Sequence, residues 1–551
     1  MNFKKIHLYF WTIKFLRIEQ VVYRIKYYIF GLNKVEVNVN SINISSWTWN
    51  SPIFSKRSYF ENKTFNLLNK EIIFDTSIGW NDINIDKLWL YNLHYFDDLN
   101  SKDATNRKDS HISLIKNWIE NNPLQESGIG WDAYPLSIRL VNWIKWYTRN
   151  QINDDEILQS IYSQAEVLKK NLEYHILGNH LFTNAKALMF VGHFFDDDIG
   201  NKFLTKALSI FDRELNEQFL EDGGHFELSP MYTASTILDI LDIVNLSKIS
   251  SRDIDLDFHD TLCKIAKRGL QWLQIMSHPD GDISFFNDSS KNIAPRISDL
   301  LKYSEKLDIY FLKKDDRKIL TTLKNSGYSC ISIDENYLLF DHANLGPDYL
   351  LGHGHADNLS LEWSIGQQRV LVNSGTSLYG NSYERHRQRK TSSHNTVVVD
   401  QCDSSEIWHG FRVARRAYSH LISSNCNTDC VSISASHDGY QRLSGKVTHI
   451  RTIEVTGSEL KIVDELNGKW NQAHGYFHFH PDIKVKEIND NILNLSLPNG
   501  LKILMETSGR IVTKNSTWHP SFYTVIDNTK CKINFDNNIL ITRFSYRRMN
   551  P

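Results

Sequence analysis

Six segments of the chain repeat apolar residues every three or four positions, which is the spacing of an α-helix with one buried face. In residues 135–146, for example, Leu136, Leu140 and Ile144 share a face with Val141. Short polar or glycine-containing turns separate the segments, so we predict helical hairpins packed side by side. The predicted helices span residues 135–146, 157–177, 180–195, 203–219, 235–248 and 260–276.

The pattern changes near Ser326, where short alternating or β-branched runs replace the helical spacing. Runs such as NTVVVD, VTHIRTIEV and LKILMET, separated by Gly, Asn and Asp, are typical of antiparallel strands. We therefore predict a multidomain α+β protein with a basic, aromatic helical extension (1–84), a domain of helical hairpins (85–325) and an antiparallel β-sandwich (326–551). The boundary between the last two is expected between about 315 and 330. No flexible linker is visible there, so we expect the two domains to pack closely around a site.

The composition indicates a globular protein without a nucleic-acid partner. The 551 residues exceed one ordinary core, and 41% hydrophobic with 23% charged residues exclude a disordered chain. The formal net charge of -2 does not suggest a nucleic-acid partner. An enzyme acting on an anionic polysaccharide would need only a local basic cleft, which the net charge does not reveal. None of the six cysteines forms a CxxC motif, so we expect free thiols, as in a reducing compartment.

Residues 1–34 hold seven Lys or Arg against one Glu, interleaved with aromatic and aliphatic residues. The apolar run is interrupted by Lys14 and Arg17 and no small-residue cleavage site follows, so we expect no secretory signal. Two interpretations remain for this segment: a helix lying on an anionic membrane surface, or a basic helix packed on the main domain. We expect a cytoplasmic protein, with the first interpretation placing it at the periphery of the inner membrane.

The most distinctive chemistry lies in the segment GHGHADNLSLEW, residues 352–363. His353 and His355 are two positions apart, so on a strand they point the same way, and Asp357 continues that parity. His394 begins a later strand-like run. Neutral imidazoles on one face can bind zinc, or one can bind a metal while its neighbour transfers a proton. Surface histidines are the ordinary alternative, but the clustering with a nearby basic run favours a functional site.

The helical half adds two motifs. Asn179 and His180 stand at the start of a predicted helix, where Asn179 is also a suitable capping residue. The segment DGGHFELSPMY, residues 222–232, places Tyr232 after a glycine turn. Such a tyrosine usually serves packing, but one that is buried beside cations can move protons.

Taken together, these segments resemble the heparinase II/III family of polysaccharide lyases, and also related alginate lyases. The resemblance covers roughly residues 85 to 545 and rests on the combination and order of its pieces rather than on any one of them. The matching segments are GWDAYPLSIRLVNW (130–143), GNHLFTNAKALMFVGHFF (178–195), DGGHFELSPMY (222–232), DGDISFFNDSS (280–290), GHGHADNLSLEW (352–363) and SSHNTVVVD (392–400).

The resemblance implies an incomplete (α/α) toroid followed by a β-sandwich, and β-elimination on a uronic acid. In that chemistry Asn179, with His180 beside it, would hydrogen-bond the substrate carboxylate. Tyr232 would be the acid and, for one stereochemistry, also the base, while His353 would be the other base or a carboxylate neutraliser. Further substrate contacts would come from four residues: Arg139, Glu227, Arg385 and Arg389.

The resemblance also implies a structural zinc ion beside the catalytic histidine. His355 and His394 match two of its ligands, and the third, an expected aspartate, is Asn373 in this chain. An amide is a much poorer zinc ligand than a carboxylate, so either Asp357 or water would have to complete the site.

From these features we expect a lyase acting on an acidic, uronate-containing polysaccharide of a cell-surface assembly pathway. A non-catalytic polysaccharide-binding or assembly factor on the same scaffold is the first alternative, because fold does not fix activity. A hydrolase is the second, with Glu227 and Asp357 as the available carboxylate pair. The sugar, its linkage and the oligomeric state stay open.

Overall fold

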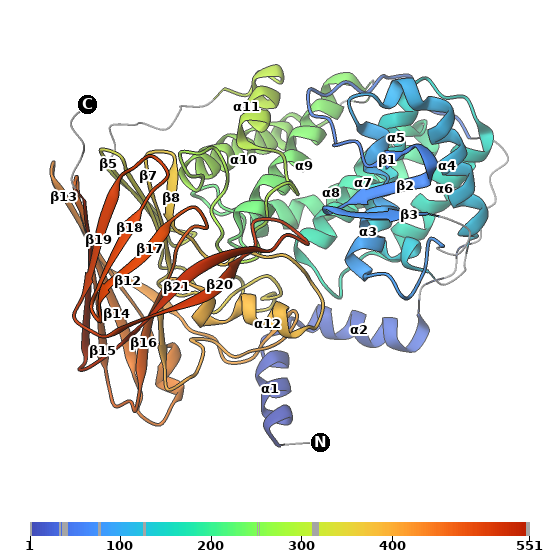
Figure 1. Ribbon diagram of the computed structural model, residues 1–551. Coiled ribbons are helices and arrows are strands. Elements are labelled where there is room, and N and C mark those ends of the chain that lie inside the picture. The colour runs from blue at the N-terminus through green and yellow to red at the C-terminus, as the bar shows by residue number, and fades with distance from the viewer. Residues whose placement is uncertain are drawn as a thin grey trace.

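The computed structural model describes residues 3–31, 33, 35, 42–74, 79–124, 128–250, 252, 254–310 and 319–546. Figure 1 shows a helical part, coloured blue to green, beside a part built of sheets, coloured yellow to red. The order of helices before antiparallel strands confirms the predicted fold class. Of the predicted boundary region, residues 315–318 lie outside the described residues; α11 ends at Lys306 and β4 begins at Leu320.

All six predicted helices are present in the helical part. Their amphipathic faces meet in one large core that contains Trp143, Phe190 and Trp272 among many apolar side chains. The helices of this part are α3 (Lys87–Tyr95), α4 (Lys108–Asn121), α5 (Ala133–Arg149), α6 (Asp155–Lys170), α7 (Gly178–Phe194), α8 (Asp197–Gln218), α9 (Pro230–Ile249), α10 (Leu256–Ile275) and α11 (Ile297–Lys306).

One helix is shorter than its apolar pattern predicts. The periodicity continues to residue 177, but α6 ends at Lys170. Beyond Lys170 the chain turns. The Glu173 carboxylate accepts a hydrogen bond from Asn184 Nδ2 at 3.0 Å and forms a second one with His180 Nδ1 at 2.9 Å. These tertiary contacts override the local pattern and bring Glu173 to the start of α7.

The N-terminal extension is only partly helical. Helices α1 (Phe3–Ile13) and α2 (Ile18–Phe30) are followed by a small antiparallel sheet of β1 (Tyr59–Phe60), β2 (Thr64–Leu67) and β3 (Lys70–Ile73). The expectation of a wholly helical extension therefore fails at residues 59–73, where Phe65 and Leu67 face the core from a short strand pair. Residues 1, 2, 32 and 34 of the basic segment lie outside the described residues.

The C-terminal part contains a five-stranded, an eight-stranded and a four-stranded antiparallel sheet. Their strand orders are β4-β5-β6-β7-β8, β12-β13-β14-β15-β22-β19-β18-β17 and β20-β21-β16-β9. The elements are β4 (Leu320–Leu323), β5 (Tyr328–Ile333), β6 (Asn336–Asp341), β7 (Leu361–Ile365), β8 (Gln368–Leu371), α12 (Tyr383–Arg389), β9 (Val397–Val399), β10 (Ile407–His409), β11 (Arg412–Val413), β12 (Ser419–Cys426), β13 (Cys430–His437), β14 (Thr448–Thr456), β15 (Glu459–Asn467), β16 (Ala473–His478), β17 (Lys484–Asn489), β18 (Ile492–Ser496), β19 (Lys502–Thr507), β20 (Ile511–Trp518), β21 (Ile526–Asn534) and β22 (Ile539–Tyr546).

The five-stranded sheet joins the two parts, because both of its faces are buried. Side chains alternate across a strand, and in β6 Tyr337 and Leu339 enter the helical core while Leu338 and Phe340 enter the core between the sheets. The eight-stranded sheet buries only one face, as the alternating burial of β14 shows. The loops that leave the five-stranded sheet therefore lie against the helical part, which positions the site.

Candidate active site

Four of the predicted catalytic and substrate residues meet where the helical part contacts the loop between β6 and β7. The rings of Tyr232, from α9, and His353, from this loop, have centroids 4.2 Å apart. His353 Nε2 lies 3.7 Å from Glu227 Oε2, and the backbone N–H of Asn179, at the start of α7, points to Glu227 Oε1 at 3.5 Å. The structure thus brings together side chains that are up to 174 positions apart, from Asn179 to His353.

Local sequence places Tyr232 and Asn179 in the first turns of their helices. Ser229 caps α9 by accepting the backbone N–H of Tyr232, and Pro230 occupies the first helical position. Gly178 begins α7 with φ +59°, and a Cβ there would lie 2.3 Å from Leu350 Cδ2. Glycine is therefore required for the close approach of α7 to the loop that carries His353.

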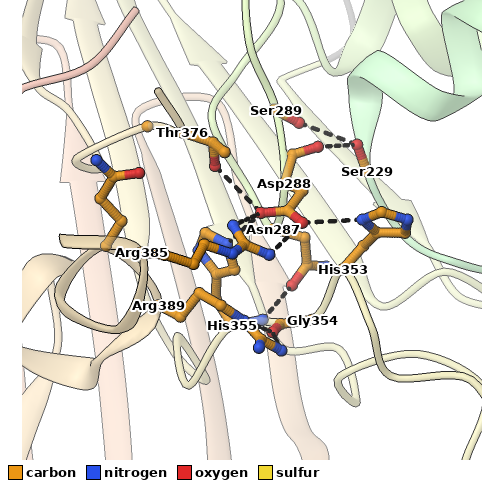
Figure 2. Close-up of polar contacts among 12 residues, drawn as sticks. Ser229, Asn287, Asp288, Ser289, His353, Gly354, His355, Thr376, Arg385 and Arg389 are labelled. Atoms are coloured by element: carbon orange, nitrogen blue, oxygen red, sulfur yellow. Dashed lines mark hydrogen bonds and ion pairs between the residues drawn. The ribbon is translucent and has the colours of Figure 1, made fainter. Parts of the chain in front are cut away.

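Asp288, in the segment between α10 and α11, is the centre of the polar network (Figure 2). Its carboxylate is fully buried and lies 2.8 Å from His353 Nδ1 and 2.9 Å from His355 Nε2. It also forms a two-pronged ion pair with Arg385 of α12 and accepts a hydrogen bond from Thr376. Burial would raise the pKa of Asp288, but the charge of Arg385 and the hydrogen bonds of both histidines hold it well below its usual value. Asp288 is therefore a carboxylate and accepts from every one of these groups.

The charge of Asp288 fixes the tautomer of His353. Because the carboxylate can only accept, Nδ1 of His353 carries the proton and Nε2 presents its lone pair. This Nε2 atom faces Glu227, whose pKa is raised above its usual value, chiefly by burial. The arrangement gives a base at Nε2 held in position from behind by a buried carboxylate, which is the way a catalytic imidazole is usually oriented.

Tyr232 is a protonated phenol at neutral pH. Its hydroxyl lies 3.0 Å from the hydroxyl of Tyr379, and burial raises the pKa of Tyr232 well above its usual value, with Tyr379 adding to the effect. A phenol in this state can donate a proton but gives it up to solvent poorly. The geometry therefore suits Tyr232 to the role of acid and His353 to that of base.

His180 lies beside these groups on the helical side. Its ring packs at a tilt against Tyr134 with centroids 4.3 Å apart, and Nδ1 is 2.9 Å from Glu173 Oε1. Burial alone would lower the pKa of His180, but the charge and hydrogen bond of Glu173 raise it above the ordinary value. Glu173 thus favours the positively charged form of His180, next to Glu227 and Asn179.

The three arginines expected to contact substrate are instead buried and bonded to protein. Arg139 lies in the helical core, where it donates to Gln164 Oε1 and the Gly130 carbonyl and lies over the Trp118 ring. Arg385 is occupied by Asp288, and all the hydrogen bonds of Arg389 go to backbone carbonyls, including those of Gly354 and Gly410. A basic run reads the same in sequence whether its charges face solvent or protein, so the pattern did not distinguish the two.

A candidate metal site lies on the other side of Asp288. His355, Asp357 and His394 are buried and offer ligand atoms within 4.8 Å of one another. His355 donates to Asp288 from Nε2, so its Nδ1 lone pair faces His394 Nε2 at 3.3 Å. Burial lowers the pKa of His355 to about 4 and that of His394 well below its usual value, so neither ring holds an extra proton. Two imidazole nitrogens and a carboxylate in a dry space are a donor set that fits zinc, which would tie the His353 loop to the strand after His394.

Asn373 does not occupy the expected third ligand position. Its Oδ1 lies 3.2 Å from His394 Nδ1, on the side of the ring away from His355. The amide oxygen accepts the Nδ1 proton and thereby leaves Nε2 of His394 as the ligand atom. The carboxylate that lies within reach of both histidines is that of Asp357. The expected role of Asn373 as a ligand is thus replaced by one in orienting His394.

Two residues of the site were not identified from the sequence. Asp288 lies in the segment DGDISFFNDSS and Tyr379 in SGTSLYG, and neither has a spacing signal of its own. In sequence, an aspartate beside Asn and Ser residues usually indicates a turn. Only the fold shows that Asp288 faces both histidines and that Tyr379 faces Tyr232.

Comparison with known proteins identifies the family of the chain. The family model for the heparinase II/III N-terminus matches residues 22–316, and the model described as heparinase II/III-like, C-terminal matches residues 315–548. This chain belongs to the heparinase II/III family. The recognised resemblance is therefore confirmed over nearly the whole chain.

Curated members of the family match over part of their length. A heparin-sulfate lyase of Bacteroides thetaiotaomicron is 26% identical over 265 residues, which is 44% of this chain and 36% of the relative. A heparin-sulfate lyase of Bacteroides stercoris is 24% identical over 263 residues, covering 43% of this chain and 38% of the relative. The matched region thus spans little more than a third of these relatives.

Solved structures share the fold over most of the chain. A crystal structure of heparinase III has a TM-score of 0.72 at 16% identity and covers 96% of this chain and 89% of its own. A heparan sulfate lyase from Pedobacter heparinus has a TM-score of 0.58 at 14% identity, with 88% and 80% covered. The helical part of this family member is accordingly the predicted toroid, followed by the sheet domain.

Proposed function

We propose that this protein is a polysaccharide lyase that cleaves a uronic-acid-containing polysaccharide by β-elimination. The observation that carries the proposal is the pairing of Tyr232 and His353, a protonated phenol and an imidazole lone pair, with ring centroids 4.2 Å apart. The names of the curated relatives, heparin-sulfate lyases, support the same class of substrate.

The first requirement of the reaction is to weaken the C5–H bond of the uronate. That proton is acidic only when the charge of the neighbouring carboxylate is neutralised. Asn179 would donate to the carboxylate, assisted by His180, whose pKa Glu173 raises, and by Glu227, whose pKa burial raises. Donors held in place by the protein stabilise the developing enolate with little reorganisation.

The elimination itself then needs one base and one acid. His353 Nε2 takes the C5 proton, and the electrons of the C5–H bond form the C4–C5 double bond. The C4–O4 bond breaks, its electrons go to O4, and the Tyr232 hydroxyl protonates that oxygen. Return of the proton from His353 to Tyr232, directly or through solvent, restores the starting state. The products are a new non-reducing-end unsaturated uronate and a new chain end bearing a hydroxyl.

The test is turnover of a panel of uronate polymers, followed by ultraviolet absorbance of the unsaturated product and by mass spectrometry. We expect Tyr232→Phe and His353→Ala each to lose roughly a hundred-fold or more of kcat, the usual contribution of a positioned acid or base. Tyr162→Phe is a matched control, because Tyr162 packs on Phe195 and Phe203 at a distance from the site.

Two results would oppose the proposal. Polymer binding without turnover in the wild type and Tyr232→Phe alike would indicate a binding or assembly factor. A saturated product with one added water would indicate a hydrolase acting through a carboxylate pair. The double bond distinguishes elimination from both alternatives.

We further propose that His355, Asp357 and His394 hold a structural zinc ion, with no step of the elimination passing through it. We also propose that the protein acts in the cytoplasm on a cell-surface polysaccharide during assembly. The six cysteines carry free thiols, which suits a reducing compartment. Fractionation of cells that produce the protein, with an assay for the uronate polymer in each fraction, tests the second proposal.

A further inference from the structure

Helix α2 is fixed to the body of the protein along one face. Gln20 is fully buried and donates to the carbonyls of Ile176 and Tyr349, and Arg24 donates to the carbonyl of His175. The Tyr27 ring stacks on the His175 ring with centroids 5.4 Å apart. The positions 20, 24 and 27 repeat at helical spacing, so these contacts define one side of the helix.

The opposite side of α2 carries a stripe of exposed apolar side chains. Ile18, Val22, Ile25 and Ile29 also repeat at helical spacing and are 83%, 54%, 54% and 63% exposed. Position 18 is two residues from Gln20, and two residues in a helix differ by about 200° around its axis. The stripe therefore points away from the body of the protein. The packing of α2 on the body does not require apolar residues on this outer side.

Helix α1 extends the same apolar surface at the N-terminal corner. Ile6, Phe10 and Ile13 are exposed and share one face, whereas Thr12 is held to the body by the Val413 carbonyl and Trp408 Nε1. Figure 1 shows α1 standing out from the body, with α2 beneath the helical part. Exposed apolar side chains gathered on one side of a helix are characteristic of an interaction surface.

The charges around the stripe have one sign. Lys5 and Lys26 are exposed on α1 and α2, and Lys14 is exposed in the turn between the two helices. The one acidic residue of the described segment, Glu19, is paired with Arg213 at 3.1 Å. Apolar side chains flanked by cations complement a surface that is apolar within and anionic at its edge, which is the structure of a bilayer containing acidic lipids.

We propose that α1 and α2 form a membrane-surface anchor that binds anionic bilayers. Helix α2 lies in the interface with Ile18, Val22, Ile25 and Ile29 among the acyl chains, and the lysines contact headgroup phosphates. No helix among the described residues is long and apolar enough to cross a membrane, so the contact is with one leaflet. Both interpretations of the basic segment then hold at once, because one face of α2 packs on the protein and the other meets lipid.

The anchor keeps the enzyme body beside the membrane. Helix α2 is connected to the loop of the candidate active site, since Tyr349, whose carbonyl accepts from Gln20, lies in the same loop as His353. The anchor would therefore hold the candidate active site near a polymer that is attached to the membrane or emerges from it.

The experiment is sedimentation of the full-length protein with vesicles of phosphatidylcholine containing phosphatidylglycerol. We expect binding that weakens as salt is raised and that is poorer on phosphatidylcholine alone. The triple variant Ile18→Ser/Val22→Ser/Ile25→Ser should bind roughly a hundred-fold more weakly, from the apolar burial lost. Lys14→Glu/Lys26→Glu should bind weakly to the mixed vesicles and should no longer distinguish them from phosphatidylcholine alone.

A matched control is Ile422→Ser/Ile488→Ser/Ile539→Ser, which removes three comparably exposed isoleucines from the eight-stranded sheet. This variant should bind as the wild type does. The proposal is overturned if the wild type stays in the supernatant, or if the α2 variant and the control bind equally. It is also overturned if the wild type self-associates in ultracentrifugation without lipid and the α2 variant does not, since the stripe would then be an interface between copies. None of these readouts depends on catalysis.

Discussion

The ion pair of Asp288 and Arg385 offers a quantitative test of the site. Both side chains are fully buried, and Asp288→Asn leaves the Arg385 guanidinium without a counter-charge in a space that solvent does not reach. Breaking one partner of a buried pair costs about 3–5 kcal/mol. The remaining acceptor of Arg385, the Gly410 carbonyl, cannot replace a two-pronged carboxylate. We therefore expect the free energy of unfolding to fall by about 3–5 kcal/mol.

The measurement is urea unfolding followed by tryptophan fluorescence, for the wild type, Asp288→Asn, Arg385→Gln and the double variant. The double variant should recover part of the loss, with a coupling free energy of at least about 2 kcal/mol between the two sites. Glu406→Gln is a matched control, because Glu406 forms a similar two-pronged pair with Arg415 that is partly exposed. That substitution should cost no more than about 1 kcal/mol.

The same variant has a second readout. Asp288→Asn removes the charge that holds the His353 Nδ1 proton, so kcat should fall even in molecules that remain folded. A loss of stability no larger than that of Glu406→Gln, or simple additivity of Asp288→Asn and Arg385→Gln, would refute the reasoning. Either result would mean that Asp288 is not the buried, charged centre of the network.

Three further predictions concern other parts of the molecule. Metal analysis should find about one zinc per chain. Asp357→Ala should remove this zinc, whereas Asn373→Ala should only lower the affinity of the site for it. A metal content unchanged by Asp357→Ala would contradict the assignment. Gly178→Ala should lower the thermal midpoint through about 1–3 kcal/mol of strain and overlap at φ +59°; an unchanged midpoint would show that α7 tolerates a Cβ at that position. Burial would raise the pKa of Asp280, but Arg369 lowers it to about 2. The stability this pair contributes is thus present above about pH 4 and lost as pH falls towards 2, so the difference in unfolding free energy between wild type and Asp280→Asn should shrink over that range, and a constant difference would oppose it.

The sequence predicted the structure correctly where the spacing of neighbouring residues determines the secondary structure. Apolar spacing of three or four residues identified all six predicted helices, and short alternating runs identified the sheet domain. The expectation that His353, His355 and Asp357 share one face of a strand was wrong, because residues 342–360 form a loop in which His353 faces Tyr232 while His355 and Asp357 face His394. The order of motifs along the chain then identified the family.

The small sheet at residues 59–73 and the early end of α6 were not predictable in the same way. Strands as short as β1 and β2 have too few residues for a period to appear. The turn after Lys170 forms because Glu173 bonds to Asn184 and His180, which no local pattern encodes.

The roles of the charged residues depended on the tertiary structure alone. Arg385 and Arg389 were expected to bind substrate, and Asp288 was not singled out, yet the three belong to one buried network. The sequence determined which groups were available: histidines, a tyrosine, carboxylates and an amphipathic basic segment. Which of them share a proton, a metal or a lipid surface is set by distances between residues far apart in the chain, because the strength of a charge and the pKa of a group depend on burial and on neighbours that only the folded chain provides.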